Sequence, residues 1–319
     1  MITEAQIFLT RRCNLNCGYC KLVKNLGDEF GLDDWIKTYK IMEKLGIKTV
    51  KLMGGEPTIK NWLPDLLRFA STTSIKTAIL SNSSFDEMMI YRLVEAGLWG
   101  YFASIDCLEQ IVIDKDPVKK TRNGYRVLRK LQKLGVPLLA ANVVVNKINI
   151  SQIPSIVMQL SNEGFYINLC TIQHTDDPTK EFSKTNIKKD YLFIEENKKK
   201  LEILSKQLLM MKKVGYKIAV PNSYIEGIST YGYHCNWQCT ELIQLRIDSD
   251  GGLMLCNEYR TKLADNYNIL KMTEEKYKEF LSQWYVARKG VNCDGCYWSC
   301  FLQAEDNIKN KKLEFEYVA

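Results

Sequence analysis

The sequence predicts an α/β protein whose first half is built from parallel strand–helix units. Three observations support this prediction: six short apolar segments with strand character, helix-like segments between them, and glycines near the ends of those helix-like segments. Strands that alternate with helices in this way are typical of parallel sheets. Glycine readily adopts the left-handed conformation that ends a helix, so helix ends are expected near Gly46, Gly97, Gly135 and Gly164.

The predicted elements follow one another in order up to about residue 175. Strands are expected at residues 6–10, 49–53, 76–81, 100–106, 138–145 and 166–171. Helices are expected between them at residues 33–45, 63–71, 85–96, 124–134 and 153–163. A linker at residues 178–185 and a long helix at about 186–214 then lead to the C-terminal region.

The composition indicates an ordinary globular protein. Of 319 residues, 46% are hydrophobic and 25% are charged, and no window approaches the unbroken apolar run of a membrane span. No signal peptide is recognisable, so we expect a cytoplasmic protein in which eleven cysteines serve metal binding rather than disulfides. The net charge of +7 comes from scattered lysines, which does not favour nucleic acid as a partner.

The most informative stretch follows the first predicted strand. Cys13, Cys17 and Cys20 are spaced C-x3-C-x2-C in a polar loop. Three thiolates in this spacing can hold three corners of one iron–sulfur cluster and leave the fourth iron without a protein ligand. Buried structural cysteines or a zinc site are the alternatives. A structural zinc site needs four ligands, and the only histidines, His174 and His234, are distant in sequence.

This motif, with an aromatic residue (Tyr19) before its last cysteine, resembles the signature of the radical S-adenosylmethionine (SAM) enzymes. The resemblance implies a partial (β/α)6 barrel with its chemistry at the carboxyl ends of the strands. It implies a [4Fe-4S] cluster held by the three cysteines, with SAM chelating the open iron. Reduction would then cleave SAM to methionine and a 5′-deoxyadenosyl radical that abstracts a substrate hydrogen.

The ends of the other strands carry candidate SAM contacts. Gly54, Gly55, Glu56 and Pro57 match the family motif that binds the SAM amino group, and glycine allows a close approach of the backbone. By the same resemblance, polar side chains at the next three strand ends are expected near the SAM ribose or carboxylate, with ordinary strand-end capping as the alternative. These are Ser81, Asn82, Ser104, Asp106 and Asn142.

A second group of cysteines lies in the last third of the chain: Cys235, Cys239, Cys256, Cys293, Cys296 and Cys300. A predicted hairpin, with strands at residues 242–247 and 253–256, brings distant cysteines together. A zinc ribbon is the structural alternative. The spacing resembles the SPASM and twitch extensions of radical SAM enzymes, which carry auxiliary [4Fe-4S] clusters. It departs from the full SPASM pattern because no cysteine follows Cys300.

We therefore expect at least one auxiliary cluster, ligated by Cys239, Cys256, Cys293 and Cys296. Cys235 or Cys300 could replace one of these ligands. The expected domains are residues 1–185 as the barrel, 186–229 as a connecting helix and linker, and 230–319 as a small α+β domain with the auxiliary cluster.

Further residues are candidates for substrate binding, proton transfer or hydrogen-atom donation. His174 and Asp176 follow the sixth strand and could bind substrate or move a proton. Cys235, Cys300 and Cys107 are candidate hydrogen-atom donors, although a small buried hydrophobe is the simpler interpretation of Cys107.

The resemblance implies a peptide- or protein-modifying enzyme that forms a crosslink, an epimer or an oxidised residue. The alternatives are an aminocyclitol or sugar dehydrogenase or epimerase, and a non-enzymatic cluster- or zinc-binding scaffold. Flavodoxin or ferredoxin is the expected electron donor. Cys13 lies too near the start for an N-terminal peptide-binding domain, so a separate peptide-recognition protein is a further expected partner.

Overall fold

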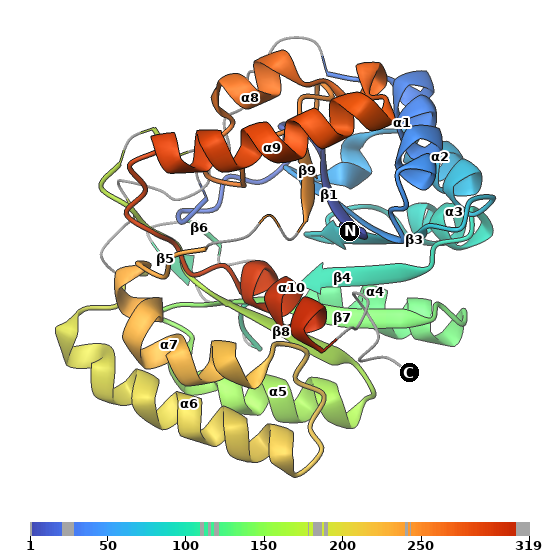
Figure 1. The fold of residues 1–319 in the computed structure, drawn as a ribbon. Helices are drawn as coiled ribbons and strands as arrows, with labels where there is room; N and C mark the ends of the chain where they lie inside the picture. Colours follow the sequence, from blue (N-terminus) through green and yellow to red (C-terminus); the bar gives the residue numbers. More distant parts are fainter. Residues whose placement is uncertain are drawn as a thin grey trace.

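The structure, a computed structural model, describes residues 2–20, 29–108, 112–113, 116–117, 121–177, 179–180, 187, 191–239, 242 and 244–310. Its centre is a seven-stranded sheet with the order β8-β7-β4-β3-β2-β1-β9, in which all paired strands are parallel (Figure 1). The strands are β1 (Glu4–Thr10), β2 (Thr49–Gly54), β3 (Lys76–Ser81), β4 (Gly100–Ser104), β7 (Leu138–Val145), β8 (Tyr166–Thr171) and β9 (Leu245–Ile247). The short strands β5 (Val112–Ile113) and β6 (Asp116–Pro117) form a separate antiparallel pair.

All six predicted strands are confirmed, and the predicted α/β class is confirmed with them. Every residue of β1 is buried, as expected for an interior strand, paired on both sides, in a parallel sheet that is covered on both faces. Because the strands are parallel, their carboxyl ends all lie at one edge of the sheet. The loops that carry the candidate site therefore meet there.

The helices of the first half follow the strands as predicted, with ends that differ by a few residues. They are α1 (Leu32–Lys44), α2 (Leu63–Ala70), α3 (Glu87–Glu95), α4 (Thr121–Lys133) and α5 (Ile153–Asn162), with short 3-10 helices at Pro57–Ile59 and Ile150–Gln152. The C-terminal helices are α6 (Lys198–Lys213), α7 (Asn222–His234), α8 (Thr261–Asn266), α9 (Glu274–Gly290) and α10 (Ser299–Lys309), with 3-10 helices at Glu195–Asn197 and Ile269–Lys271.

The long helix predicted at about 186–214 begins later than expected. Its α-helical part is α6, preceded by the 3-10 turn Glu195–Asn197. The Asn197 side chain accepts a hydrogen bond from the Ile194 backbone N–H (2.9 Å), which caps the turn and ends helical structure toward the N-terminus. Residues 186 and 188–190 of this predicted helix, and residues 178 and 181–185 of the predicted linker, lie outside the described residues.

The C-terminal region completes the sheet. β9 adds to the free edge of β1, with Gln6 opposite Arg246. The predicted hairpin turn follows β9, where an antiparallel bridge joins Ile247 to Leu253, but the return strand predicted at residues 253–256 does not extend beyond this bridge. Helix α10 packs on β8 and α7 and also reaches β1, because Asn307 donates a hydrogen bond to the Glu4 carboxylate (3.0 Å) (Figure 1). It therefore joins the edge strand β8 to β1, which lies next to the opposite edge strand β9.

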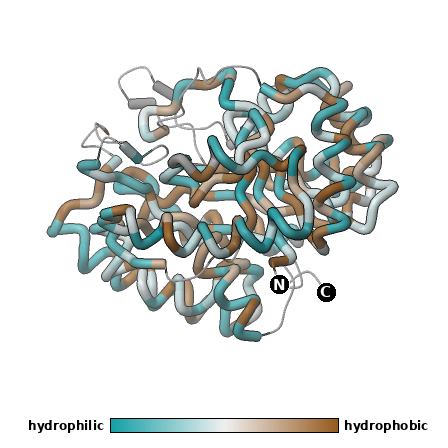
Figure 2. The backbone as a smooth tube through the Cα atoms, turned by 45° about the horizontal axis from the view of Figure 1, so that its top comes forward, coloured by the Kyte–Doolittle hydropathy of each residue, from teal (hydrophilic) through white to brown (hydrophobic). Residues whose placement is uncertain are grey.

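Hydrophobic residues concentrate on the central strands, whereas hydrophilic residues prevail on the outer turns of the helices (Figure 2). This pattern matches the buried core, which runs from β1 through the barrel helices to α9. None of the helices in the described part of the chain has the length and apolar character needed to cross a bilayer.

Candidate active site

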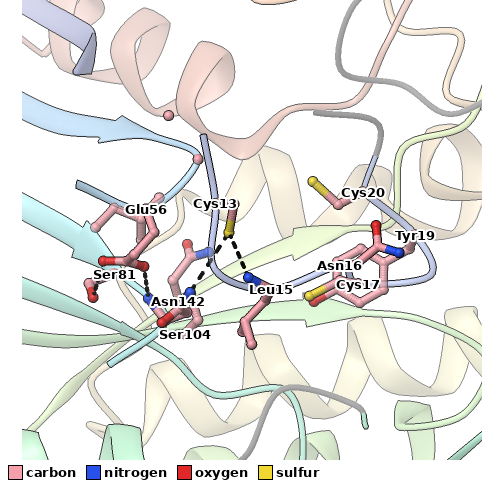
Figure 3. Close-up of a pocket in the computed structure, with 14 residues that line it drawn as sticks. Cys13, Leu15, Asn16, Cys17, Tyr19, Cys20, Glu56, Ser81, Ser104 and Asn142 are labelled. Atoms are coloured by element: carbon pink, nitrogen blue, oxygen red, sulfur yellow. Dashed lines mark hydrogen bonds between the residues drawn. The ribbon is translucent and has the colours of Figure 1, made fainter. Parts of the chain in front are cut away.

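The three N-terminal cysteines line one pocket at the carboxyl edge of the sheet. Cys13, Cys17 and Cys20 lie on the loop after β1, and their sulfur atoms face a common space (Figure 3). The pocket also receives residues from the ends of β2, β3, β4 and β7: Gly54, Gly55, Glu56, Leu80, Ser81, Asn82, Ser104 and Asn142.

The three thiols that line the pocket fit three cysteine ligands of one iron–sulfur cluster. Among the described residues, no three His, Cys, Asp or Glu side chains are arranged to hold one ion. Each thiolate of a [4Fe-4S] cluster binds a different iron, so its cysteines stand farther apart than the ligands of one ion.

The base of the cluster loop is held by Glu29, which the sequence did not single out. Its carboxylate accepts hydrogen bonds from Thr10 Oγ1 (2.9 Å) and from the Arg11 backbone N–H (2.8 Å), and it pairs with Lys60 (2.6 Å). Burial opposes ionisation, but the Lys60, Arg11 and Thr10 bonds hold the pKa of Glu29 below its ordinary value. The loop is thereby closed where it leaves and re-enters the fold.

The end of β2 supports the cluster loop directly. Gly55 N–H donates to Thr10 O (2.8 Å), and Glu56 N–H donates to Arg12 O (2.9 Å). Gly54 has a φ of +125°, and a Cβ there would lie 2.3 Å from Thr10 O. Gly54 was predicted to let the backbone approach a ligand. In the structure, it lets the end of β2 approach the cluster loop at Thr10.

Glu56 joins β2 to β3 behind the pocket. Its carboxylate accepts bonds from Thr58 Oγ1 (2.6 Å), Ser81 Oγ (2.7 Å) and Asn82 N–H (2.7 Å). Burial raises the pKa of Glu56, and these bonds oppose the rise. Glu56 Oε2 accepts the Asn82 bond and has capacity for a second donor, such as an ammonium group. Ser81 is committed to Glu56, while the Asn82 amide lies 3.9 Å from Cys13 Sγ.

Asp106 was expected near SAM, but it lies behind the pocket and does not line it. Ser104 and Asn142 line the pocket, whereas Asp106 is fully buried and does not. Its carboxylate accepts hydrogen bonds from the Tyr19 hydroxyl and from the Val144 N–H (2.9 Å). Asp106 therefore anchors the aromatic residue of the cysteine motif, and the pKa of Tyr19 is raised by burial and by the Asp106 charge.

Three candidate catalytic residues lie apart from the pocket. Cys107 is fully buried in the main core. His174 Nε2 lies 2.9 Å from the Tyr233 backbone oxygen, and Asp176 is exposed. None of the three is among the residues described as lining the pocket.

The second cysteine group is gathered by backbone contacts. Cys296 N–H donates to Trp237 O (3.0 Å), and the Gln238 side chain donates to Cys293 O (3.1 Å), so the Cys293–Cys296 turn lies against the segment that carries Cys239. Burial, the Glu258 carboxylate and neighbouring Cys239 raise the pKa of the Cys256 thiol to about 12. The sulfurs of this group are therefore close enough to influence one another electrostatically.

Cys235 and Cys300 also lie near Cys170, and Cys300 packs in one cluster with Cys256 and Cys296. Cys235 Sγ donates to Ile172 O (3.4 Å), and burial followed by the Cys170 charge raises the pKa of Cys235 to about 12. Cys300 accepts a contact from the Arg246 guanidinium (3.8 Å) and contributes to the raised pKa of Cys170. These thiols gather around the end of β8.

Residues 7–160 match the family model of the Radical SAM superfamily. The chain carries a radical SAM domain. Such a domain binds a [4Fe-4S] cluster and SAM, and the pocket fits both, with three thiols facing one space and polar strand ends around it. The protein is accordingly a radical SAM enzyme.

Curated relatives of this radical SAM enzyme include proteins named as a nucleotide cyclase and as a peptide cyclase. A probable GTP 3′,8-cyclase of Pyrococcus horikoshii is 26% identical over 277 residues, covering 83% of this chain and 86% of its own length. The PqqA peptide cyclase of Bradyrhizobium diazoefficiens is 27% identical over 175 residues, covering 52% of this chain and 45% of that protein.

Solved structures share the fold. SuiB of Streptococcus suis bound to S-adenosylmethionine matches with a TM-score of 0.67 and 17% identity, covering 98% of this chain and 75% of its own. In another SuiB structure the match spans 66% of that chain. Native anSMEcpe with bound AdoMet and Cp18Cys peptide matches with a TM-score of 0.66 and 19% identity, covering 99% of this chain and 93% of its own.

Proposed function

We propose that this radical SAM enzyme modifies a peptide and uses a second iron–sulfur centre held by Cys239, Cys256, Cys293 and Cys296. The observation that carries the proposal is the convergence of these cysteines from three separate segments of the chain. The pKa of the Cys296 thiol is raised by burial, by the Glu258 charge, and by the Cys256 and Cys239 thiols. This effect supports the proximity of Cys296 to the other two cysteines. A four-thiol set is complete for a [4Fe-4S] cluster.

Each proposed centre has a distinct chemical role. A cluster held by Cys13, Cys17 and Cys20, with SAM bound, would supply radical abstraction of a hydrogen atom from the substrate. The chain's own part is to hold the cluster loop by Glu29 and Tyr19 and to brace it on Gly55 and Glu56. A second centre would provide an acceptor for the electron that a net oxidation removes.

A peptide substrate is supported by two of the solved structures and by one curated relative. SuiB and anSMEcpe, which share the fold, were solved with bound peptides, and the PqqA peptide cyclase matches half of the chain. The peptide in each case belongs to that protein. For this chain the peptide is the substrate class that we propose.

Cyclisation of GTP is the second candidate. It is favoured by the match to probable GTP 3′,8-cyclases. The match to the Pyrococcus horikoshii protein covers 83% of this chain. Against it, the Arg246 guanidinium in β9 is buried and already engaged. It donates to Asn257 Oδ1 (2.5 Å) and lies 4.3 Å from the centre of the Phe301 ring.

The test is a comparison of substrates under anaerobic conditions. The reconstituted enzyme is given SAM, a reductant, and either GTP, an aminocyclitol panel or synthetic peptides encoded beside its gene. We expect a peptide to lose hydrogen by mass spectrometry, with formation of 5′-deoxyadenosine above the substrate-free level. Turnover of GTP or of an aminocyclitol, with every peptide unchanged, would overturn the proposal.

A further inference from the structure

A buried lysine lies against the second cysteine group. The side chain of Lys180 is 1% exposed, although it carries a positive charge. Its ammonium group donates a hydrogen bond to Gly295 O and pairs with the Asp294 carboxylate. Both partners lie between Cys293 and Cys296, so the charge is held at the turn that joins two of the proposed cluster ligands.

The turn is also fixed by neutral contacts. The Gln173 amide donates to Tyr297 O (2.9 Å) and accepts from Tyr297 N–H (2.7 Å), and Thr175 Oγ1 donates to Asp294 (2.9 Å). These bonds already attach the Cys293–Cys296 turn to the segment after β8. A buried charge is unfavourable unless it is compensated, so attachment alone does not account for a lysine here.

The surrounding charges indicate what the lysine compensates. Burial lowers the pKa of Lys180, but the Asp294 bond and the charges of Asp294, Glu258 and Cys293 raise it above its ordinary value. Glu258 is 2% exposed, and Arg288 donates to Cys239 O (3.4 Å). The charged neighbours of the cysteine group therefore include the cations Lys180 and Arg288 and the anions Glu258 and Asp294.

A [4Fe-4S] cluster gains negative charge when it is reduced, and its reduction potential depends on nearby charge and on burial. A fixed cation in a dry environment stabilises the reduced form more than the oxidised form. We infer that Lys180 is a positioning residue that raises the reduction potential of the second centre without ligating iron. This inference rests on the proposed function, because it requires the centre held by the four cysteines.

The potential of the second centre is the readout. The full chain is prepared with Cys13, Cys17 and Cys20 replaced by alanine, so that any remaining cluster belongs to the second group. Its potential is measured by redox titration followed by electron paramagnetic resonance, with and without Lys180→Met. Lys180→Arg is the control that keeps the charge.

We expect Lys180→Met to shift the potential to a more negative value and Lys180→Arg to leave it close to that of the parent. An unchanged potential in Lys180→Met, with the iron content intact, would overturn the inference while leaving the proposed function standing. A parent protein with no iron would instead overturn the proposed function, and the inference with it.

A second variant keeps the test decisive if Lys180→Met fails to hold its cluster. Asp294→Asn removes an anion from the same turn and retains the ability to accept from Thr175. We expect its potential to shift to a more positive value. The absence of a shift in this direction would show that charge at the turn does not set the potential.

Discussion

Arg11 and Asp248 form a buried bidentate ion pair between the two cysteine regions. Arg11 Nε lies 2.8 Å from Asp248 Oδ1, and Arg11 Nη2 lies 2.9 Å from Oδ2. Arg11 precedes Cys13 by two residues, whereas Asp248 begins the hairpin turn that leads to Cys256. Arg260 also donates to Asp248 (2.6 Å). The pair therefore fixes the N-terminal cluster loop against the segment that carries a proposed ligand of the second centre.

Breaking this pair is expected to destabilise the protein strongly. Arg11→Met leaves the Asp248 carboxylate buried with one fewer cation, and loss of one partner of a buried pair costs about 3 to 5 kcal/mol. The free energy of unfolding, measured with denaturant, checks this value. The control is Arg68→Met, which breaks an exposed pair with Asp65 and should cost less than about 1 kcal/mol. Equal effects of the two variants would contradict the account.

The Asp248 carboxylate is expected to make the folded protein less stable in acid. Burial would raise the pKa of Asp248, but the bonds and charges of Arg11 and Arg260 lower it below its ordinary value. Since the pKa is lower in the folded state, ionised Asp248 stabilises the fold above the unfolded pKa of about 3.9. That stabilisation is lost as the pH falls through the folded pKa.

The measurement is the difference in unfolding free energy between wild type and Asp248→Asn, followed from about pH 6 to pH 3. We expect the advantage of the wild type to shrink toward the acid end of this range. A difference that stays constant with pH would show that Asp248 does not titrate as proposed.

Tyr19→Phe tests the anchor of the cysteine motif. The change removes the hydroxyl that donates to Asp106 and keeps the ring that packs at 5.5 Å from Tyr191. An unsatisfied buried acceptor costs about 1 to 3 kcal/mol. We expect a less stable cluster loop, seen as slower formation of 5′-deoxyadenosine at full iron loading. Wild-type rates in this variant would show that the anchor is dispensable.

Gly54→Ala tests the support of the loop by β2. The new Cβ would meet Thr10 O at 2.3 Å, and the φ of +125° is unfavourable for alanine. We expect loss of SAM binding and cleavage together with reduced iron loading of the N-terminal site. Gly290→Ala is the matched control, because no atom lies within 4 Å of its new Cβ. Normal SAM cleavage in Gly54→Ala would contradict the predicted clash.

The sequence predicted the strand–helix order well because its signals are local. Apolar runs, the cysteine spacing and the glycines near helix ends each depend on neighbouring residues. The place of Cys13, Cys17 and Cys20 at the end of β1, in one pocket with Gly54 and Glu56, followed from these signals and from the family resemblance.

What the sequence did not predict depends on contacts between distant residues. Neither the pairing of Arg11 with Asp248 nor the position of Lys180 has a local signature. The same is true of Asp106, which was expected at SAM but is committed to Tyr19 and to the backbone of β7. The run of polar and charged residues after β8 could have drawn attention to Lys180, but not to its partner Asp294.

The most direct test of the second centre is its iron content when the first is removed. The variant with Cys13, Cys17 and Cys20 replaced by alanine is reconstituted anaerobically and analysed for iron and sulfide. The account predicts about four iron atoms per chain, which fall to background when Cys239 and Cys256 are also replaced. Background iron in the first variant would contradict it.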